Sequence, residues 1–303
     1  MTDAKLYDIA IIGGGMAGLT AAIYAARANK SVVLFERKVY GGQILTSMKV
    51  SNYPGESGIS GYELMKKVYE QAKKYDVVFV DEDVISIKDD KNKELKTEDE
   101  IFYAKTVIIA TGTKDRELDI PGEKEFLGHG LSYCATCDGA FYMDKPVAVV
   151  GGGNTALYDA LYLADIASKV YLIHRRDEFR GDAHLVEKLR EKKNVEFVME
   201  SRPNKLLGDK KISGIEVIDT AGEKKTLDVD GVFVAIGRVP ATEQFKDIVK
   251  LDKDGYIVAG EDCHTSAEGI FVAGDCRTKT LRQLVTASSD GAMAATEAVH
   301  YLK

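Results

Sequence analysis

Near the start of the chain, the order of apolar and polar positions predicts a strand, a tight turn, a helix and a second strand. The apolar run 9–12 is followed by three consecutive glycines and then by the helix-like stretch LTAAIYAARANK. A second apolar run, SVVLFE, ends at Glu36. Short apolar runs on either side of a helical pattern are typical of a βαβ unit in a parallel sheet.

The glycines of this turn have the spacing G-x-G-x-x-G, formed by Gly13, Gly15 and Gly18. The first permits the tight turn, the second lets a pyrophosphate approach the backbone, and the third lets the helix pack on the strand. Glu36 follows at the distance, about 20 residues, at which a carboxylate binds the ribose hydroxyls of an adenosine. This unit is therefore predicted to bind FAD or NAD.

The pattern recurs in KPVAVVGGGNTA, where Gly151, Gly153 and Ala156 have the spacing G-x-G-x-x-A. His174 takes the place of Glu36, so the acid is missing. The segment HRRDEFR instead supplies His174, Arg175, Arg176 and Arg180. Guanidinium groups bind a 2′-phosphate through paired charge-assisted hydrogen bonds, whereas a carboxylate would repel it. The second unit is therefore predicted to be of the NADP type.

Two further apolar strands, VIIATG (107–112) and VFVAIG (232–237), each end in glycine and extend the repeat. The C-terminal stretch 269–302 holds another such strand and a long Ala-rich helix, which we expect to complete the first domain. The predicted fold class is α/β, with two Rossmann-like, three-layer ββα dinucleotide-binding domains. The predicted boundaries are 1–113 and 244–303 for a discontinuous FAD domain, with an NADPH domain, 114–243, inserted into it.

Composition narrows the function. The chain has 303 residues, 45% of them hydrophobic and 29% charged, as expected for a globular protein of about two domains. A net charge of −7 disfavours nucleic-acid binding. The uncharged stretch 9–26 contains four glycines, which favours the strand–turn–helix interpretation over a membrane span. No secretory signal opens the sequence, and we expect a cytoplasmic location.

Cys134 and Cys137 form a C-x-x-C motif just before the second βαβ unit. A structural zinc site needs four ligands, and the remaining cysteines, Cys263 and Cys276, form no second C-x-x-C; we expect them to be small residues without a special role. A thioredoxin-like domain is disfavoured because the motif runs straight into a nucleotide-binding unit. The alternative without a function is that the two cysteines are an inert pair of small buried residues. The favoured interpretation is a dithiol that exchanges electrons with a flavin.

A flavin connects hydride chemistry to thiol chemistry, since a nicotinamide delivers two electrons and a disulfide accepts two. Two nucleotide sites and one dithiol would make a complete relay on a single chain. Asp138, directly after Cys137, is a candidate for the proton transfers of thiol chemistry. Its simpler alternative is a turn former before Gly139.

Together these motifs resemble the low-molecular-weight thioredoxin reductases over essentially the whole chain. The segments that carry the resemblance are GGGMAG with Glu36, GGQ (41–43), NYPG (52–55), ATG (110–112), CATCDG (134–139), GGGNTA (151–156), HRRDEFR (174–180) and GDCRTKTLRQ (274–283). The family commonly has two glutamates where Tyr158 and Asp159 stand.

The resemblance implies a homodimeric FAD enzyme that reduces thioredoxin with NADPH, and neither a nucleic-acid nor a membrane partner. It implies that Cys137 is the thiol next to the flavin, that Cys134 attacks thioredoxin and that Asp138 is the general acid. The implied FAD residues are Gly13, Gly15, Gly18, Glu36, Gly42, Gln43, Asn52, Thr111, Gly112, Asp275, Arg282 and Gln283. The implied NADPH residues are Gly151, Gly153, Asn154, Thr155, His174, Arg175, Arg176, Arg180 and Gly237. It also implies that the inserted domain rotates to present nicotinamide and dithiol to the flavin in turn.

Overall fold

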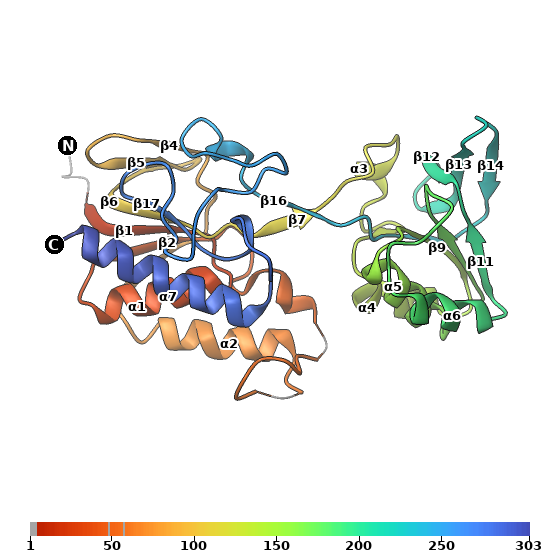
Figure 1. Cartoon of the computed structure of the whole chain (residues 1–303), viewed down its shortest axis with the longest axis horizontal. Helices are drawn as coiled ribbons and strands as arrows, with labels where there is room; N and C mark the ends of the chain where they lie inside the picture. The colour runs from red at the N-terminus through yellow and green to blue at the C-terminus, as the bar shows by residue number, and fades with distance from the viewer. Residues whose placement is uncertain (1–4, 48, 57) are drawn as a thin grey trace. The chain divides into compact units, whose positions relative to one another are not determined.

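The computed structural model describes residues 5–47, 49–56 and 58–303. The chain forms two compact units, drawn in Figure 1. Unit 1 consists of Met1–Lys114 and Val239–Lys303, and unit 2 is the inserted segment Asp115–Arg238. The predicted insertion of one unit into a discontinuous other one is therefore confirmed.

The second crossing between the units lies earlier than the predicted boundary at 243. Ala241 donates a backbone hydrogen bond to Gly112 and accepts one from the hydroxyl of Thr111 at 2.7 Å. Thr242 is buried. These contacts tie residues 239–243 into unit 1. The two crossings run as a two-stranded sheet of β7 (Thr113–Asp115) and β16 (Arg238–Pro240).

Unit 1 is built on one mixed sheet. Its strand order is β3 (Val77–Val80), β2 (Val32–Phe35), β1 (Leu6–Ile12), β6 (Ile101–Ile109), β5 (Lys93–Lys96) and β4 (Ser86–Lys88). The C-terminal strand β17 (Ile270–Val272) pairs in parallel with β6, so the tail completes the first domain as predicted.

The helices of unit 1, α1 (Met16–Arg27), α2 (Gly61–Ala72) and α7 (Leu284–Tyr301), lie on one face of this sheet (Figure 1). Ile9 and Ile11 pack under them, whereas Ala10 and Ile12 pack against Phe245 on the other face. This alternation is the two-residue period of a strand. The uncharged stretch 9–26 is thus β1, the glycine turn and most of α1. Within the described residues, no helix is long and apolar enough to cross a bilayer.

Unit 2 has three layers. Its parallel sheet has the order β11 (Val195–Val198), β10 (Lys169–Ile173), β9 (Pro146–Val150), β15 (Gly231–Val234) and β8 (Leu131–Ser132). Val147 and Val149 face the helices α5 (Asn154–Ala164) and α6 (Ala183–Glu191). Ala148 and Val150 face an antiparallel sheet of β12 (Ser201–Gly208), β13 (Ile212–Asp219) and β14 (Lys224–Leu227). The predicted ββα layering is confirmed.

Short helical segments connect these layers and carry several site residues. They are η1 (Gly42–Thr46), α3 (Glu123–Phe126), α4 (Ala135–Asp138), η2 (Gly139–Tyr142), η3 (Glu243–Phe245) and η4 (Gly274–Cys276).

Candidate active site

Of the three glycines that form the G-x-G-x-x-G spacing of the first turn, packing requires two and leaves one open. A Cβ on Gly13 would lie 2.4 Å from the carbonyl oxygen of Ala110, and one on Gly18 would lie 1.8 Å from the carbonyl oxygen of Gly13. A Cβ on Gly15 would meet no atom within 4 Å. The backbone at Gly15 is therefore open to a ligand, which is the role expected of the second glycine.

Unit 2 repeats this arrangement. A Cβ on Gly151 would lie 2.3 Å from the carbonyl oxygen of Ala235, whereas one on Gly153 would meet nothing within 4 Å. Gly15 and Gly153 are the N-caps of α1 and α5, and neither helix has a side-chain cap. The first amide groups of both helices are thus available to an anion, and both turns fit a pyrophosphate.

Glu36 is fixed beside the first turn. One carboxylate oxygen accepts a hydrogen bond from the amide of Gly14 and the other from the amide of Lys38, both at 2.9 Å. The carboxylate therefore stands at the end of β2 next to the glycine turn. This position fits the predicted contact with the ribose hydroxyls of an adenosine.

The GGQ segment lies against the same turn. A Cβ on Gly42 would be 3.3 Å from the Cα of Gly15, and the Nε2 of Gln43 donates to the carbonyl oxygen of Thr113. The structure thus gathers six of the predicted FAD residues around β1 and β6: Gly13, Gly15, Gly18, Gly42, Thr111 and Gly112.

Four further predicted FAD residues come from distant parts of the sequence and meet at the start of α7. Asn52 donates through Nδ2 to Oε1 of Gln283 at 2.9 Å. The Nε of Arg282 donates to the carbonyl oxygen of Asp275 at 3.3 Å. Its guanidinium carbon also lies 4.0 Å from the centre of the Tyr256 ring. The loop 274–283 is therefore held in one arrangement beside the helix N-terminus.

A buried carboxylate that the sequence analysis missed supports this loop. Asp290, on α7, accepts hydrogen bonds from the amide of Gly274 at 2.9 Å, from Arg277 at 2.9 Å and from Lys279 at 2.7 Å. Burial acts to raise the pKa of Asp290, but the hydrogen bonds from the two cations outweigh it and lower the pKa overall. Only packing reveals this group, since nothing in the local sequence distinguishes it from a surface acid.

Unit 2 contains a pocket of about 530 Å³ over its glycine turn. Its lining includes four predicted residues, Gly151, His174, Arg175 and Arg180. It also includes Arg116, Arg202 and Asn204, which were not predicted because they lie outside the βαβ unit. Four arginines against one lining acid, Asp119, give the pocket the positive charge that a phosphate monoester requires.

His174 contributes shape rather than charge to this pocket. A Cβ on Gly152 would strike its ring at 2.2 Å, and its ring stacks on that of Phe179 with centroids 5.3 Å apart. Its Nε2 lies 3.1 Å from the carbonyl oxygen of Glu178. Burial lowers the pKa of His174, and the neighbouring arginines lower it further. The imidazole is therefore neutral at pH 7.

The other predicted NADPH residues do not line this pocket. The side chain of Asn154, at the start of α5, accepts a hydrogen bond from the amide of Asp182 at 2.7 Å. Thr155 and Arg176 are exposed, and neither lines the pocket. Gly237 has a φ of 103°, and a Cβ there would meet no atom within 4 Å.

Cys134 and Cys137 form a disulfide, with their Cα atoms 5.4 Å apart. Cys134 is the N-cap of α4, and Cys137 lies within it. The pair belongs to unit 2, the unit that carries the arginine-lined pocket. Within the described ranges, no three His, Cys, Asp or Glu side chains are grouped to hold a metal. The motif thus has the form of a redox disulfide.

Asp138 lies at the end of the same short helix, and its carboxylate accepts a hydrogen bond from the hydroxyl of Ser132 at 2.6 Å. Ser132 was not among the predicted residues, although it stands only two positions before Cys134. A serine hydroxyl has no pattern in sequence that separates a structural role from a functional one, so only the contact identifies it.

The two remaining cysteines are unsuited to thiol exchange. Cys263 and Cys276 are reduced and fully buried. Burial raises the pKa of Cys276 to about 11 and that of Cys263 to about 12. A thiol attacks as the thiolate, so both are inert at neutral pH.

Known proteins are similar to this chain in sequence and in structure. The family model of the pyridine nucleotide-disulphide oxidoreductases matches residues 7–291. Thioredoxin reductase of Bacillus subtilis is 40% identical over 306 residues, covering 100% of this chain and 97% of that protein. The bifunctional thioredoxin reductase/thioredoxin of Mycobacterium leprae is 41% identical, covering 98% of this chain and 66% of that protein. The crystal structure of Lactococcus lactis thioredoxin reductase has a TM-score of 0.87 at 38% identity, covering 98% of this chain and 99% of that one.

Proposed function

The chain belongs to the pyridine nucleotide-disulphide oxidoreductases and, within them, to the thioredoxin reductases, and from this premise we propose the role of each part of its site. The enzyme uses NADPH and FAD to reduce the disulfide of thioredoxin. One observation carries the assignment of roles: the Cys134–Cys137 disulfide lies in the same unit as the arginine-lined nucleotide pocket.

Unit 1 is the FAD domain and unit 2 the NADPH domain in this proposal. The open backbone at Gly15 and the carboxylate of Glu36 would hold the pyrophosphate and ribose of FAD. The open backbone at Gly153 would hold the pyrophosphate of NADPH, and Arg175 and Arg180 its 2′-phosphate. A bound FAD would supply the two-electron chemistry that connects the hydride of NADPH to the cysteine pair.

The reduced cysteine pair then performs two exchanges. The thiolate of Cys134 attacks one sulfur of the thioredoxin disulfide, which forms a mixed disulfide and releases the other sulfur as a thiolate. Cys137 attacks the sulfur of Cys134, which re-forms the Cys134–Cys137 bond and releases the second thioredoxin thiolate. Asp138, beside the pair, is the group that donates protons to the thiolates.

The surroundings of the pair suit a protein partner. Phe141 and Met143 follow the motif and are 72% and 59% exposed. Large apolar side chains with this exposure favour a docking surface over a solvent-facing turn. We place thioredoxin there, in contact with the half-buried Cys134.

Buried Cys263 and Cys276 in the reduced state agree with a cytoplasmic location, where structural disulfides are rare.

A homodimer would pair through the face formed by α1 and α7. Tyr24 is 50% exposed there, Val285 42% and Met293 41%. Two hollows, of about 370 Å³ and 320 Å³, lie along the same helices. An exposed apolar face of this kind is typical of an interface between copies. Sedimentation of the parent and of Tyr24→Glu tests this: a monomeric variant is expected, and a monomeric parent would contradict the dimer.

The two crossings of the chain, β7 and β16, would act as the hinge about which unit 2 rotates between hydride transfer and thiol exchange. A crosslink that locks the units is expected to preserve one half-reaction and to stop turnover. Full turnover in the locked enzyme would rule the rotation out.

Cys134→Ser tests the electron path. NADPH should still bleach the flavin absorbance of this variant, while thioredoxin reduction is lost. Cys263→Ala, which removes a buried thiol of unit 1, is the matched control and should keep full activity. Thioredoxin reduction by Cys134→Ser would contradict the proposal, and so would an NADPH oxidation that proceeds without any flavin signal.

Other acceptors are the main alternative within the same chemistry. Reduction of a panel of thioredoxins and glutaredoxins, driven by NADPH or by NADH, separates them. The four lining arginines predict a preference for NADPH, and they disfavour a ferredoxin-driven relative. The loss of thioredoxin reduction in Cys134→Ser separates the reductase from a flavoprotein that senses NADPH without turnover.

A further inference from the structure

Ser132 is a buried residue at the end of β8, directly before the cysteine motif, and only 5% of it is exposed. Its strand pairs in parallel with β15, where Ser132 lies opposite Phe233. The backbone of Ser132 therefore belongs to the rigid sheet of unit 2, while its side chain reaches the end of the motif that carries the chemistry.

The hydroxyl oxygen of Ser132 contacts both ends of that motif. It lies 2.6 Å from Oδ2 of Asp138, 3.0 Å from the amide nitrogen of Cys134 and 3.3 Å from the carbonyl oxygen of Cys134. The amide can only donate, so it donates to the hydroxyl. One hydroxyl thus connects the acid to the backbone of the cysteine that attacks the partner.

The single hydroxyl proton has two possible acceptors. While Asp138 is ionised, the shorter contact to a charged oxygen is the stronger one, and the proton points to Oδ2. Once Asp138 is protonated, its own O–H can donate to the Ser132 oxygen, and the serine proton turns to the carbonyl oxygen of Cys134. A hydroxyl accepts two hydrogen bonds and donates one, so every group stays satisfied in both states.

We propose that Ser132 is a positioning residue for the proton donor Asp138. Its hydroxyl holds the Asp138 carboxyl group at the cysteine pair, whether that group is protonated or ionised. The same hydroxyl couples the protonation state of Asp138 to the backbone of Cys134. The proposal rests on the proton-donor role proposed above for Asp138.

Two electrons pass from the Cys134 and Cys137 sulfurs to the thioredoxin disulfide, and the Cys134–Cys137 bond re-forms. The proton of the Cys137 thiol passes to one released thiolate, and the other released thiolate takes the proton of Asp138, which becomes a carboxylate. The Ser132 O–H then turns from the carbonyl oxygen of Cys134 to Oδ2. Water returns a proton to Asp138 before the next release.

The test is a double-mutant cycle on the holoenzyme with Ser132→Ala, Asp138→Asn and the two combined. We expect Ser132→Ala to lower kcat with thioredoxin about tenfold and to leave KM for thioredoxin and the NADPH bleaching of the flavin unchanged. If Ser132 acts through Asp138, the double variant should be no slower than Asp138→Asn alone.

Matched substitutions separate this role from a structural one. The substitutions Ser132→Thr and Ser132→Val introduce side chains of the same shape that differ only in the hydroxyl. Ser132→Thr should therefore keep the rate of thioredoxin reduction, and Ser132→Val should lose it. This comparison holds even if Ser132→Ala lowers the stability of the fold. Thr97 is also fully buried, and its hydroxyl both donates to and accepts from the backbone of Glu100. Thr97→Ala therefore removes a comparable hydroxyl and should lower the melting temperature without changing kcat.

Three results would overturn the proposal in different ways. Full activity in Asp138→Asn removes the proton-donor role itself. A normal rate in Ser132→Val removes the role of the hydroxyl while leaving the rest of the mechanism intact. Effects of Ser132→Ala and Asp138→Asn that multiply in the double variant show that the serine does not act through the acid.

Discussion

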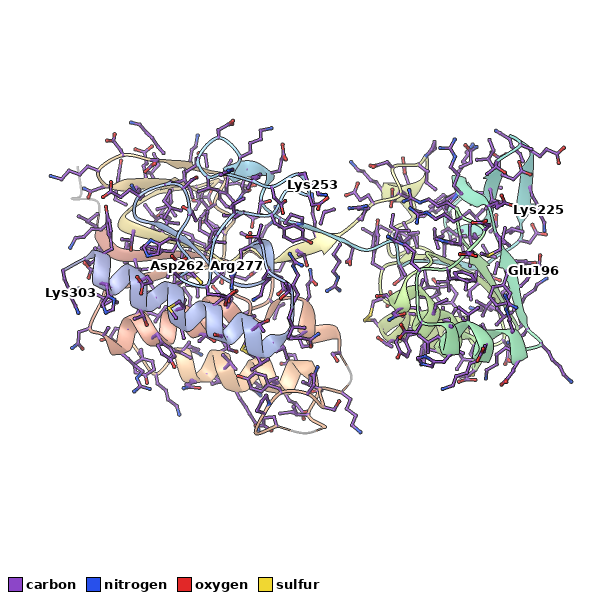
Figure 2. The ribbon with its side chains drawn as sticks, in the orientation of Figure 1. Glu196, Lys225, Lys253, Asp262, Arg277 and Lys303 are labelled. Atoms are coloured by element: carbon purple, nitrogen blue, oxygen red, sulfur yellow. A yellow bond between two sulfur atoms is a disulfide. The ribbon has the colours of Figure 1, made fainter. Side chains whose placement is uncertain are left out.

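Arg277 and Asp290 form a buried two-point ion pair, in which Nε and Nη2 of the arginine each lie 2.9 Å from a different carboxylate oxygen. Arg277, labelled in Figure 2, has a side chain only 2% exposed, and that of Asp290 is 5% exposed. The same carboxylate accepts the amide proton of Gly274, the residue before Asp275. The pair thus connects the core of α7 to a loop that we assign to FAD.

Asp290→Asn is expected to destabilise the enzyme by about 3 kcal/mol, because it leaves Lys279 buried without its counter-charge and leaves Arg277 with only the exposed carboxylate of Glu261, at 3.2 Å. The loop 274–283 should loosen as well, so FAD should dissociate more readily. Urea denaturation and the fluorescence of released FAD measure the two effects.

An exposed ion pair provides the control for Asp290. Asp83 pairs with Arg37 at 3.2 Å, and both side chains are more than half exposed. Asp83→Asn should cost less than about 1 kcal/mol. An equal loss of unfolding free energy in the two variants would show that the buried ion pair contributes no more to stability than the exposed one.

Asp159, on α5, predicts a pH-dependent stability. Burial raises its pKa from 3.8 to about 6. Because this pKa is higher in the folded than in the unfolded state, stability is lost as the pH rises from about 4 through 6. Asp159→Asn should therefore stabilise the protein above pH 6, by on the order of 2 kcal/mol, and should have no effect below pH 4.

Urea denaturation between pH 3.5 and 8 measures this difference. The exposed Asp209, changed to Asn, controls for the chemical replacement alone. A stabilisation by Asp159→Asn that stays constant across the whole range would show that the charge of Asp159 is not its cause.

Gly15 and Gly18 predict opposite outcomes for the same substitution. Gly18→Ala places a Cβ 1.8 Å from the carbonyl oxygen of Gly13 and should prevent the turn from forming. Gly15→Ala meets no protein atom within 4 Å and should fold normally, yet lose FAD because the new methyl group occupies the approach to the pyrophosphate. Circular dichroism and the flavin-to-protein absorbance ratio distinguish them. Normal FAD content in Gly15→Ala would place the pyrophosphate elsewhere.

Arg180→Gln should raise KM for NADPH by about 10- to 100-fold and leave KM for NADH nearly unchanged, because only NADPH carries the 2′-phosphate that a guanidinium would bind. Arg202→Gln tests whether the lining residue outside the βαβ unit contributes to the same preference. Arg190, exposed at the end of α6, is the control. Equal losses with NADPH and NADH would exclude a role in recognising the phosphate.

The sequence by itself determined the features that depend on neighbouring residues. The glycine spacing at Gly13 and Gly151, the exchange of Glu36 for His174 and the C-x-x-C motif are short-range patterns, because a phosphate turn and a redox pair are each built within a few residues. Apolar runs also determined the strands, because a strand that is buried on both faces of its sheet needs apolar side chains at successive positions.

Tertiary structure decided what comes from distant segments. Asn52 meets Gln283 across 231 positions, and Arg202, on β12, enters a pocket whose other arginines follow β7 and β10. The hydroxyl of Ser132 and the carboxylate of Asp290 acquired their partners only through packing. The true second crossing, at 238, likewise depends on hydrogen bonds of Ala241 within unit 1. Side-chain partners of this kind depend on how whole layers pack, which no local pattern records.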